Sequence, residues 1–362
     1  MRKRLSKTVD IATLHAQISQ MRNSLKADRL DMSFGEIMAT YERGELIISP
    51  DFQRLFRWDI EQRTRFLESI ILGIPIPPIF VAEDKKGRWE LVDGLQRVST
   101  ILSFFGNLKG PGVRKENGWI LREATLVPAL KGFTAGTLPN NYILNIKRAV
   151  CRVEIIKWDS QWDMRYELFS RLNTGGSPLT EQEVRNSIFR GGLKRLYAFV
   201  DEIKHSDVFV KLVDLSENRK SKLYDDELII RFLSLANNWR NVDASISNHA
   251  TAYMQSMLKR REDISKDAEE QFRDILMLLA PLGGDIFRAR STFSASLYEA
   301  IMVATAEYLD QFKANPRKLC EAVKILRADT KFREMRGGAS SSTRTRVRIG
   351  YAVEVFGNVL AK

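Results

Sequence analysis

Cysteine and histidine are scarce in this chain of 362 residues. The two cysteines, Cys151 and Cys320, can form neither a disulfide framework nor a zinc site built from clustered cysteines. The three histidines, His15, His205 and His249, are far apart and show no metal-ligand spacing. This scarcity argues against the common zinc sites and predicts a protein of a reducing cytoplasm.

Long apolar runs and two familiar signatures are also absent. No stretch approaches the roughly 18 apolar residues of a membrane-spanning helix, which predicts a soluble protein. The N-terminus carries Arg2, Lys3, Arg4 and Lys7, but no apolar stretch follows, so a signal peptide is not expected. There is no Gly-x-x-x-x-Gly-Lys-Ser/Thr loop, which excludes a standard P-loop NTPase.

Basic residues outnumber acidic ones, with 57 Lys and Arg against 45 Asp and Glu and a formal net charge of +12. Such an excess favours a polyanionic partner, such as a nucleic acid or a nucleotide. The basic N-terminal residues either form a nucleic-acid-binding arm or are a solvated terminus without a role. The length suits two or three domains, since domains usually contain about 100 to 200 residues.

The first part of the chain mixes helix and strand patterns. One helix is expected over residues 10–30, and a Ser33-x-x-Glu36 box opens a second helix that ends near Gly44. Strand patterns cover residues 46–48, 76–82, 89–92 and 149–158, a helix pattern covers residues 61–72, and residues 107–140 have the glycine and proline content of a long irregular segment.

Beyond about residue 160 the sequence indicates helices almost exclusively. Thr180 and Glu183 form a capping box, and amphipathic stretches cover residues 225–239, 268–281 and 293–313. The expected fold class is therefore α+β, with a mixed N-terminal domain followed by an all-helical C-terminal domain. The expected domains are an N-terminal helical extension over residues 1–32, a mixed domain over 33–160 and a helical domain over 161–362.

An arginine stands where the electrostatics of a helix disfavour it. In the run from Asp93 to Arg97, Asp93 is expected to be the N-cap, Gly94 to permit the turn, and Gln96 to complete a capping box. Arg97 then falls in the first turn, where a cation is unfavourable by up to about 1 kcal/mol unless an anion shares the site. A bound phosphate would remove this conflict.

Two further polar segments are candidates for the same site. Arg54 and Arg57 follow Gln53 and precede a tryptophan, and three converging arginines would suit a triphosphate; the alternative is that they pair with surface carboxylates. Asn173, in an Asn-Thr-Gly-Gly run, either contributes to that site with neighbouring backbone N–H groups or belongs to an ordinary loop between helices.

A cluster of arginines near the C-terminus is a candidate DNA contact. Arg336, Arg344, Arg346 and Arg348 flank a Gly/Ser-rich run, and such a loop can follow a phosphate backbone. The alternative is a solvated loop with charges at the ends of its flanking helices.

Four segments in order resemble a known family over roughly residues 34–235. They are Pro50-Asp51-Phe52-Gln53-Arg54 with Trp58, Glu68 to Ile79, Val92-Asp93-Gly94-Leu95-Gln96-Arg97, and Leu172-Asn173-Thr174-Gly175-Gly176 with Gln182-Glu183-x-Arg185-Asn186. This arrangement is similar to the N-terminal domain of GmrSD-type restriction systems.

The resemblance implies a fold of the ParB and sulfiredoxin group, with an Asp-Gly-Gln-Gln-Arg motif that binds a nucleoside triphosphate and in several members supports its hydrolysis. It also implies a role in defence against phage or foreign DNA. Asp93, Gly94, Gln96 and Arg97 match that motif, and Gln53 and Arg54 match the upstream one. Leu95 replaces the first glutamine, which favours nucleotide binding over hydrolysis.

The chain departs from many relatives in a second way. They carry an HNH-type nuclease that needs paired histidines, and the three histidines here do not fit one. A nuclease of another kind remains an alternative, because Pro50-Asp51 and Glu83-x-Lys85 fit a Pro-Asp…Glu-x-Lys pattern that can hold Mg²⁺.

The function expected is that of a ParB-like protein that binds, and in one version hydrolyses, a nucleoside triphosphate with Mg²⁺, and acts on or with DNA. Arg54, Arg57 and Arg97 would hold phosphates, Asp93 would cap the helix or hold Mg²⁺, and Gln53 or Gln96 would orient water. A partner protein would supply nuclease activity. The alternatives are a non-enzymatic DNA-binding module with a degenerate pocket, or a nuclease using Asp51 and Glu83.

Overall fold

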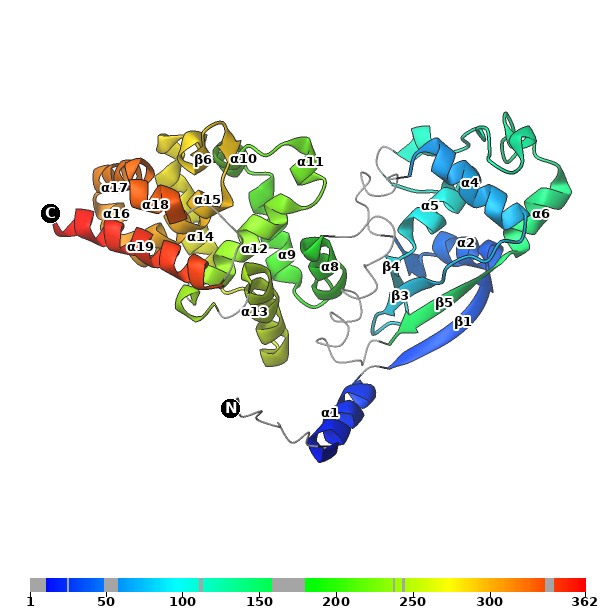
Figure 1. Cartoon of the computed structure of the whole chain (residues 1–362), viewed down its shortest axis with the longest axis horizontal. Coiled ribbons are helices and arrows are strands. Elements are labelled where there is room, and N and C mark those ends of the chain that lie inside the picture. The colour runs from blue at the N-terminus through cyan, green and yellow to red at the C-terminus, as the bar shows by residue number, and fades with distance from the viewer. Residues whose placement is uncertain are drawn as a thin grey trace, which may run out of the picture. The chain divides into compact units, whose positions relative to one another are not determined.

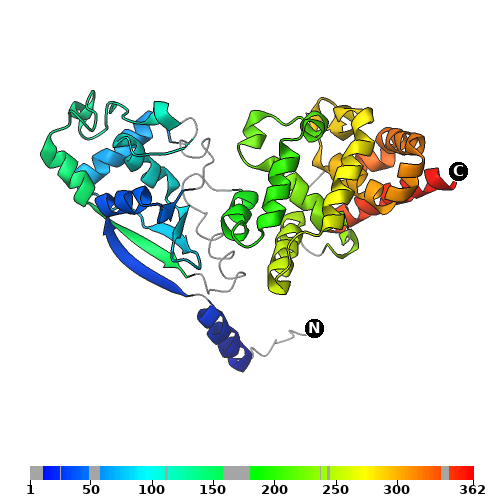
Figure 2. The same ribbon diagram turned by 180° about the vertical axis from the view of Figure 1, so that it is seen from behind.

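A computed structural model describes residues 11–24, 26–48, 58–110, 113–157, 180–236, 238–242, 245–335 and 342–362 of the chain. These residues divide into two compact units, Met1–Pro178 and Leu179–Lys362. Figures 1 and 2 show the two units from opposite sides. The domain boundary predicted after residue 160 lies outside the described residues, and the predicted domains stay predictions.

The first unit contains a five-stranded mixed sheet with the order β1-β5-β3-β4-β2 (Figure 1). The strands are β1 Ala27–Ser33, β2 Leu46–Ile47, β3 Ile79–Glu83, β4 Trp89–Asp93 and β5 Val150–Ile156. β1 pairs antiparallel with β5 and β3 antiparallel with β4, whereas β3 with β5 and β2 with β4 are parallel. The mixed α/β character expected of this part is confirmed, and the ParB-like topology stays a prediction.

The N-terminal segment corrects one sequence prediction. Helix α1 covers Ile11–Ser24, but residues 27–33 form strand β1 rather than the end of a helix over residues 10–30. β1 pairs with β5 along its whole length, and Arg29 with Glu154 and Asp31 with Arg152 form ion pairs across the two strands. Pairing with a distant strand, which no local pattern reveals, determines the conformation here.

Four helices of this unit surround the sheet core. They are α2 Phe34–Glu42, α4 Ile60–Ile71, α5 Leu95–Phe104 and α6 Asn140–Arg148. The hydroxyl of Ser33 accepts a hydrogen bond from the N–H of Glu36 at 3.2 Å, so the predicted start of α2 is confirmed. α4 begins with a complete Asp59–Gln62 capping box. The most buried core side chains include Phe34, Leu67, Val81, Leu102 and Phe104.

The segment between α5 and α6 is irregular, as predicted, and contains two short 3₁₀ turns, η1 Val113–Glu116 and η2 Pro128–Leu130. Helix α4 anchors it with buried polar side chains. Glu68 accepts hydrogen bonds from the N–H groups of Leu126 and Val127 at 2.7 and 2.6 Å, and Thr64 accepts one from the N–H of Arg122 at 3.1 Å. The irregular segment is therefore a fixed part of the unit.

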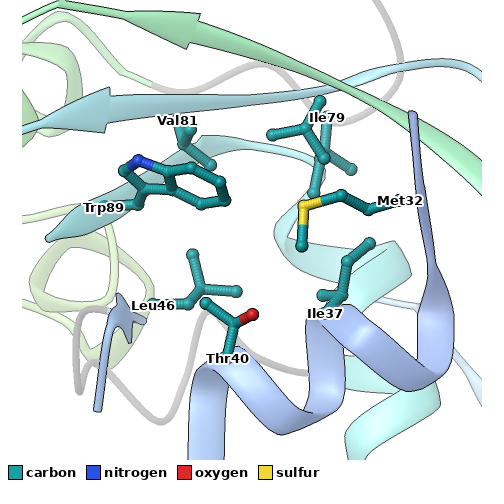
Figure 3. Close-up of a pocket in the computed structure, with 8 residues that line it drawn as sticks. Met32, Ile37, Thr40, Leu46, Ile79, Val81 and Trp89 are labelled. Carbon is teal, nitrogen blue, oxygen red and sulfur yellow. The ribbon is translucent and has the colours of Figure 1, made fainter. Parts of the chain in front are cut away.

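A small cavity between α2 and the sheet illustrates the packing of the core (Figure 3). Its volume is about 10 Å³, which leaves room for no more than one water molecule. The hydroxyl of Thr40, which lines this cavity, donates to the carbonyl oxygen of Glu36 at 2.8 Å and is therefore satisfied. The other lining residues are Met32, Ile37, Leu46, Ile79, Val81, Trp89 and Val153. This cavity is a packing defect rather than a ligand site.

Among its described residues, the second unit is helical apart from one two-stranded hairpin, β6 Arg288–Ala289 with β7 Thr292–Phe293, so the all-helical prediction is corrected at this hairpin. The helices are α8 Glu181–Phe189, α9 Lys194–Lys204, α10 Asp207–Val213, α11 Glu217–Lys220, α12 Tyr224–Ala236, α13 Ile246–Arg260, α14 Lys266–Leu279, α15 Ala295–Glu307, α16 Leu309–Ala314, α17 Pro316–Ala328, α18 Thr330–Met335 and α19 Ser342–Ala361, with 3₁₀ turns η3 Trp239–Asn241, η4 Ala280–Leu282 and η5 Gly284–Phe287.

Helix α15 lies at the centre of this unit. Ten of its side chains, from Leu297 to Ala306, are buried, and it packs against α12, α14 and α19. A helix that is apolar nearly all round is expected in such a position. The stretch predicted as one helix over residues 293–313 is divided at Tyr308 into α15 and α16. None of the described helices is both long and apolar enough to cross a membrane.

Candidate functional site

The Asp93–Arg97 motif joins strand β4 to helix α5. β4 ends at Asp93, Gly94 is the N-cap with φ +97°, and α5 begins at Leu95. The N-cap residue is Gly94 rather than Asp93, and no side-chain capping hydrogen bond is made by it, so the capping box predicted for Asp93 and Gln96 is wrong. Asp93 stands one residue before the cap position, and its carboxylate is engaged elsewhere.

Gly94 is required by both its conformation and its surroundings. Its positive φ is a backbone state that other residues rarely adopt. A Cβ atom placed on Gly94 would lie 2.5 Å from Cγ2 of Ile79 on β3. The glycine thus lets the start of α5 pack closely against the sheet, and the space is filled by a core side chain rather than open to a ligand.

Arg97 lies in the first turn of α5, as predicted, and Asp93 resolves its electrostatic conflict. Its Nη2 donates to Oδ2 of Asp93 at 2.8 Å, and its Nη1 donates to the carbonyl oxygen of Pro77 at 3.0 Å. The Arg97 side chain is only 12% exposed, whereas that of Asp93 is 46% exposed. The anion that the sequence required is therefore supplied within the chain, and a phosphate is not needed to explain this arginine.

Two motifs that are distant in sequence meet at α5. The backbone N–H of Trp58 donates a hydrogen bond to Oε1 of Gln96 at 3.0 Å. Residues 49–57, which include Gln53, Arg54 and Arg57, lie outside the described residues, but Trp58 follows them directly. Strand β2, which runs parallel to β4, is the last described element before them. The described chain resumes at Trp58, beside the first turn of α5.

Trp58 is held from a second side by Arg63 of α4. Nε of Arg63 donates to the carbonyl oxygen of Trp58 at 3.1 Å, and Nη1 contacts Oε2 of Glu116 in η1 at 3.0 Å. Arg63 is 4% exposed, whereas the side chain of Glu116 is 34% exposed, so only the guanidinium is largely removed from water. The indole of Trp58 also packs on Phe66, with ring centroids 5.5 Å apart. Arg63 thus connects α4 with Trp58 and with the irregular segment between α5 and α6.

This role of Arg63 is absent from the sequence predictions. One signal was available, because Arg63, Leu67 and Ile70 recur at the spacing of one helix face. An arginine on an apolar face is either a surface residue near the edge or a buried, paired group. A second signal was the spacing of Asp59 and Gln62, which is typical of a capping box and predicts a well-defined helix start directly after Trp58.

The thiol nearest to Arg97 is not a nucleophile. Cys151 on β5 is buried, its Sγ lies 3.9 Å from the carbonyl oxygen of Pro77, and burial raises the pKa of the thiol. A thiol held protonated in apolar surroundings is inert.

Of the residues of the nuclease alternative, the structure describes Glu83 and Lys85. Oε2 of Glu83 lies 3.1 Å from Nζ of Lys157, the residue that follows β5, and Lys85 lies in the β3–β4 turn. Asp51 lies outside the described residues. Within the described residues, no three His, Cys, Asp or Glu side chains are grouped as metal ligands. The pairing of Glu83 with Lys157 indicates a structural carboxylate.

The fourth motif begins the helical unit. Thr180 and Glu183 form the predicted capping box, with both reciprocal hydrogen bonds present, so this prediction is confirmed. Asn173 lies outside the described residues. The remaining motif residues, Gln182, Arg185 and Asn186, are buried on α8.

These three side chains form a polar network inside the second unit. Nε of Arg185 donates to Oε1 of Gln182 at 2.8 Å, and its Nη1 donates to the hydroxyl of Ser247 on α13 at 2.7 Å. Nδ2 of Asn186 donates to Oδ2 of Asp226 on α12 at 3.0 Å. This part of the motif stabilises the helical unit.

The C-terminal arginines differ in exposure. Arg336 lies outside the described residues, Arg344 is exposed and Arg346 is half-buried. Arg348 is 5% exposed, and its Nη2 donates to Oε2 of Glu299 on α15 at 2.7 Å. A guanidinium bound inside a helical core cannot reach DNA, so Arg348 is removed from the predicted DNA contacts. The other three stay predictions.

The comparisons with known proteins agree with the resemblance seen in the sequence. The family model described as GmrSD restriction endonuclease, N-terminal domain, matches residues 34–190. Neither the curated proteins nor the solved structures gave a match to the chain. The matched range contains the Trp58–Gln96 contact, the Asp93–Arg97 pair and helix α8. Residues 34–190 of this chain therefore resemble the N-terminal domain of the GmrSD restriction endonucleases, which implies a DNA-related role in a restriction system.

Proposed function

We propose that the first unit binds a nucleoside triphosphate at the start of α5 and that this binding serves the DNA-related role of a restriction system. The observation that carries the proposal is the Trp58–Gln96 hydrogen bond. It anchors the end of the segment that contains Gln53, Arg54 and Arg57 beside the turn that contains Arg97. This contact supports the proposal that the Gln53–Arg57 motif and the Asp93–Arg97 motif serve one site.

The start of α5 has the properties of an anion site. The N-cap residue, Gly94, has no side chain that could cap the helix, and the N-terminus of a helix presents backbone N–H groups and a partial positive charge. A guanidinium has five N–H donors, and the two hydrogen bonds of Arg97 to Asp93 and Pro77 use only part of this capacity. Triphosphate oxygens at this end of α5 would be held by backbone N–H groups and by arginines.

The described residues suit Mg²⁺ only as an ion that arrives with the nucleotide. Asp93 is one partly exposed carboxylate that already binds Arg97. Mg²⁺ in nucleotide sites is commonly held by one or two carboxylates together with phosphate oxygens and water. Asp93 fits such a role, and the ion would neutralise phosphate charge there.

Hydrolysis has weaker support than binding. Leu95 occupies the motif position of the first glutamine and has no group that orients water. Oε1 of Gln96 already accepts the hydrogen bond from Trp58. The site is therefore better suited to holding a nucleotide, with Gln53 as the remaining candidate for positioning water.

The experiment is an equilibrium titration of the whole chain with ATP, GTP, CTP and UTP, each with and without Mg²⁺, followed by a phosphate-release assay. Wild type is compared with Arg97→Ala and with Arg88→Ala. Arg88 is a matched control because it also pairs with an aspartate four residues earlier, Asp84, at 2.8 Å, but in the β3–β4 turn.

We expect Arg97→Ala to weaken nucleotide binding at least tenfold, since a charge-assisted hydrogen bond contributes about 1.5 to 3 kcal/mol. Arg88→Ala should bind as wild type does. Arg97→Lys keeps the charge but loses the planar fork, and an intermediate affinity is expected. Binding of no nucleotide by wild type would refute the proposal, and binding without phosphate release would identify a nucleotide sensor.

One observation favours a second function, a non-enzymatic DNA-binding module. The Asp93–Arg97 ion pair satisfies the arginine without a ligand, as expected of a pocket that has become structural. In that case wild type binds DNA but none of the nucleotides in the same titration.

A further inference from the structure

Helix α1 carries an apolar stripe that its own unit leaves uncovered. Ile11, Leu14 and Ile18 are 62, 47 and 42% exposed. Every described side chain of this helix is classed as exposed. In Figures 1 and 2 no other described helix or strand of the first unit lies alongside α1. An exposed stripe of large aliphatic side chains on one helix face marks an interaction surface.

The spacing of the stripe identifies the kind of partner. The positions 11, 14 and 18 follow the alternating steps of three and four residues that define positions a and d of a heptad, and in the sequence the same steps continue to Met21 and Leu25. Position a is then isoleucine twice, and position d is leucine and methionine. β-Branched residues at position a with leucine at position d favour a parallel coiled coil of two helices.

The remaining residues of α1 are compatible with a second copy of the same helix. Ala12, Ala16 and Ser19 lie on the outer positions b and f. In a parallel pair, position g of one helix approaches position e of the next heptad in the other helix, which here brings Gln17 near Arg22. No like charges face each other across that contact, so two identical helices are not repelled.

We propose that α1 pairs in parallel and in register with α1 of a second copy of this chain. Such a pair has twofold symmetry, so each stripe covers its own equivalent. The helix has 14 residues, which is about 21 Å in length and two heptads. Isolated helices of this length are marginal. The dimer is therefore dependent on protein concentration.

Site-directed crosslinking tests the pairing directly. Leu14→Cys places a thiol at position d, which faces itself in a parallel pair, and Ala16→Cys places one at the outer position f. Both variants are made in a Cys320→Ser background, because Cys320 is partly exposed whereas Cys151 is buried. We expect Leu14→Cys to form a disulfide-linked dimer at least ten times faster than Ala16→Cys. Equal rates would overturn the proposal.

Sedimentation equilibrium of the full chain provides a second measurement. Wild type should pass from monomer to dimer as its concentration rises. Ile18→Asp should raise the dissociation constant at least tenfold, because a charge enters the seam, whereas Ala16→Asp should change it little. The two variants introduce the same residue into the same helix, so a general loss of helicity affects both. A wild type that stays monomeric throughout would also overturn the proposal.

Discussion

The N–H of Trp58 donates a hydrogen bond to Oε1 of Gln96 across 38 residues of sequence. Nε of Arg63 donates to the carbonyl oxygen of the same tryptophan, so both the backbone N–H and the backbone C=O of residue 58 have side-chain partners. The position of Trp58 thus depends in part on one amide side chain in the first turn of α5.

Replacing Gln96 by leucine should release Trp58. The N–H of Trp58 would lose its acceptor, at a net cost of about 1 kcal/mol. Gln96→Glu keeps an oxygen at the same position and is the matched control. We expect faster amide hydrogen exchange in peptides that contain Trp58 for Gln96→Leu and nearly unchanged exchange for Gln96→Glu. Equal protection in the two variants would show that Arg63 alone holds this segment.

Gly94→Ala should destabilise the first unit by roughly 2 to 4 kcal/mol in urea unfolding. The new Cβ would be forced into a positive φ and would lie 2.5 Å from Cγ2 of Ile79. Gly87→Ala is the control, because Gly87 also has a positive φ of +77°, but no other atom lies within 4 Å of the place that its Cβ would take. It should cost about 1 kcal/mol.

The contribution of the clash can be separated further with Ile79→Ala. In that background the Cγ2 atom is gone, so Gly94→Ala should cost less than it does in wild type. A cost that is the same in both backgrounds would mean that the backbone conformation alone requires glycine at position 94.

The C-terminal arginines should divide into two classes. Arg344→Ala should weaken DNA binding and reduce the slope of log K against log salt by about 1, because an exposed arginine can contact a phosphate. Arg348→Met should instead lower stability by roughly 3 kcal/mol, since Glu299 would lose a buried partner. Arg317→Ala, at another exposed arginine, controls for net charge. If Arg344→Ala and Arg317→Ala weaken DNA binding equally, Arg344 contributes to DNA binding only through the net charge of the chain.

Asp225 should make the helical unit less stable at neutral pH. Its pKa is raised, mainly by burial and secondly by the neighbouring Asp226. A carboxyl group whose pKa is higher in the folded state binds its proton more tightly there, so stability falls as pH rises through that raised pKa. Asp225→Asn should therefore be more stable than wild type at pH 7, and the difference should shrink on acidification.

The control for this effect is Asp207→Asn, at the exposed first residue of α10. A carboxylate near a helix N-terminus is favourable, so this substitution should bring no gain at pH 7. Urea unfolding at pH 7 and at about pH 4 gives both comparisons. A gain for Asp225→Asn that is independent of pH would contradict the electrostatic explanation.

Local patterns predicted much of the fold. The β3–β4 hairpin, the start of α2 at Ser33 and the Thr180–Glu183 box were all identified, because turns and caps depend on neighbouring residues. Strand β1 was missed because its evidence is the pairing with β5, more than a hundred residues away. Asp93 matched the capping pattern, but its position in β4 and its contact with Arg97 decided its role.

The candidate site was also predicted only as far as local sequence patterns reach, because its partners come from elsewhere in the fold. The unusual position of Arg97 was evident from spacing, but its partner could have been a phosphate or a carboxylate, and only the structure shows Asp93 there. Arg348 belongs to a run of arginines that the sequence predicts to be exposed, but the packing of α19 against α15 buries it. Charge counts do not reveal which face of a helix is inside.

The buried contacts of Arg185 determine where this chain can be cut for expression. A fragment ending at residue 190, where the family match ends, would contain α8 without α12 and α13. Arg185 would then lose Ser247, and Val184, Ile188 and Phe189, which are at most 2% exposed in the whole chain, would face solvent. The limit of sequence similarity is thus not a limit of folding, and truncation designs should keep α8 with the helices that follow it.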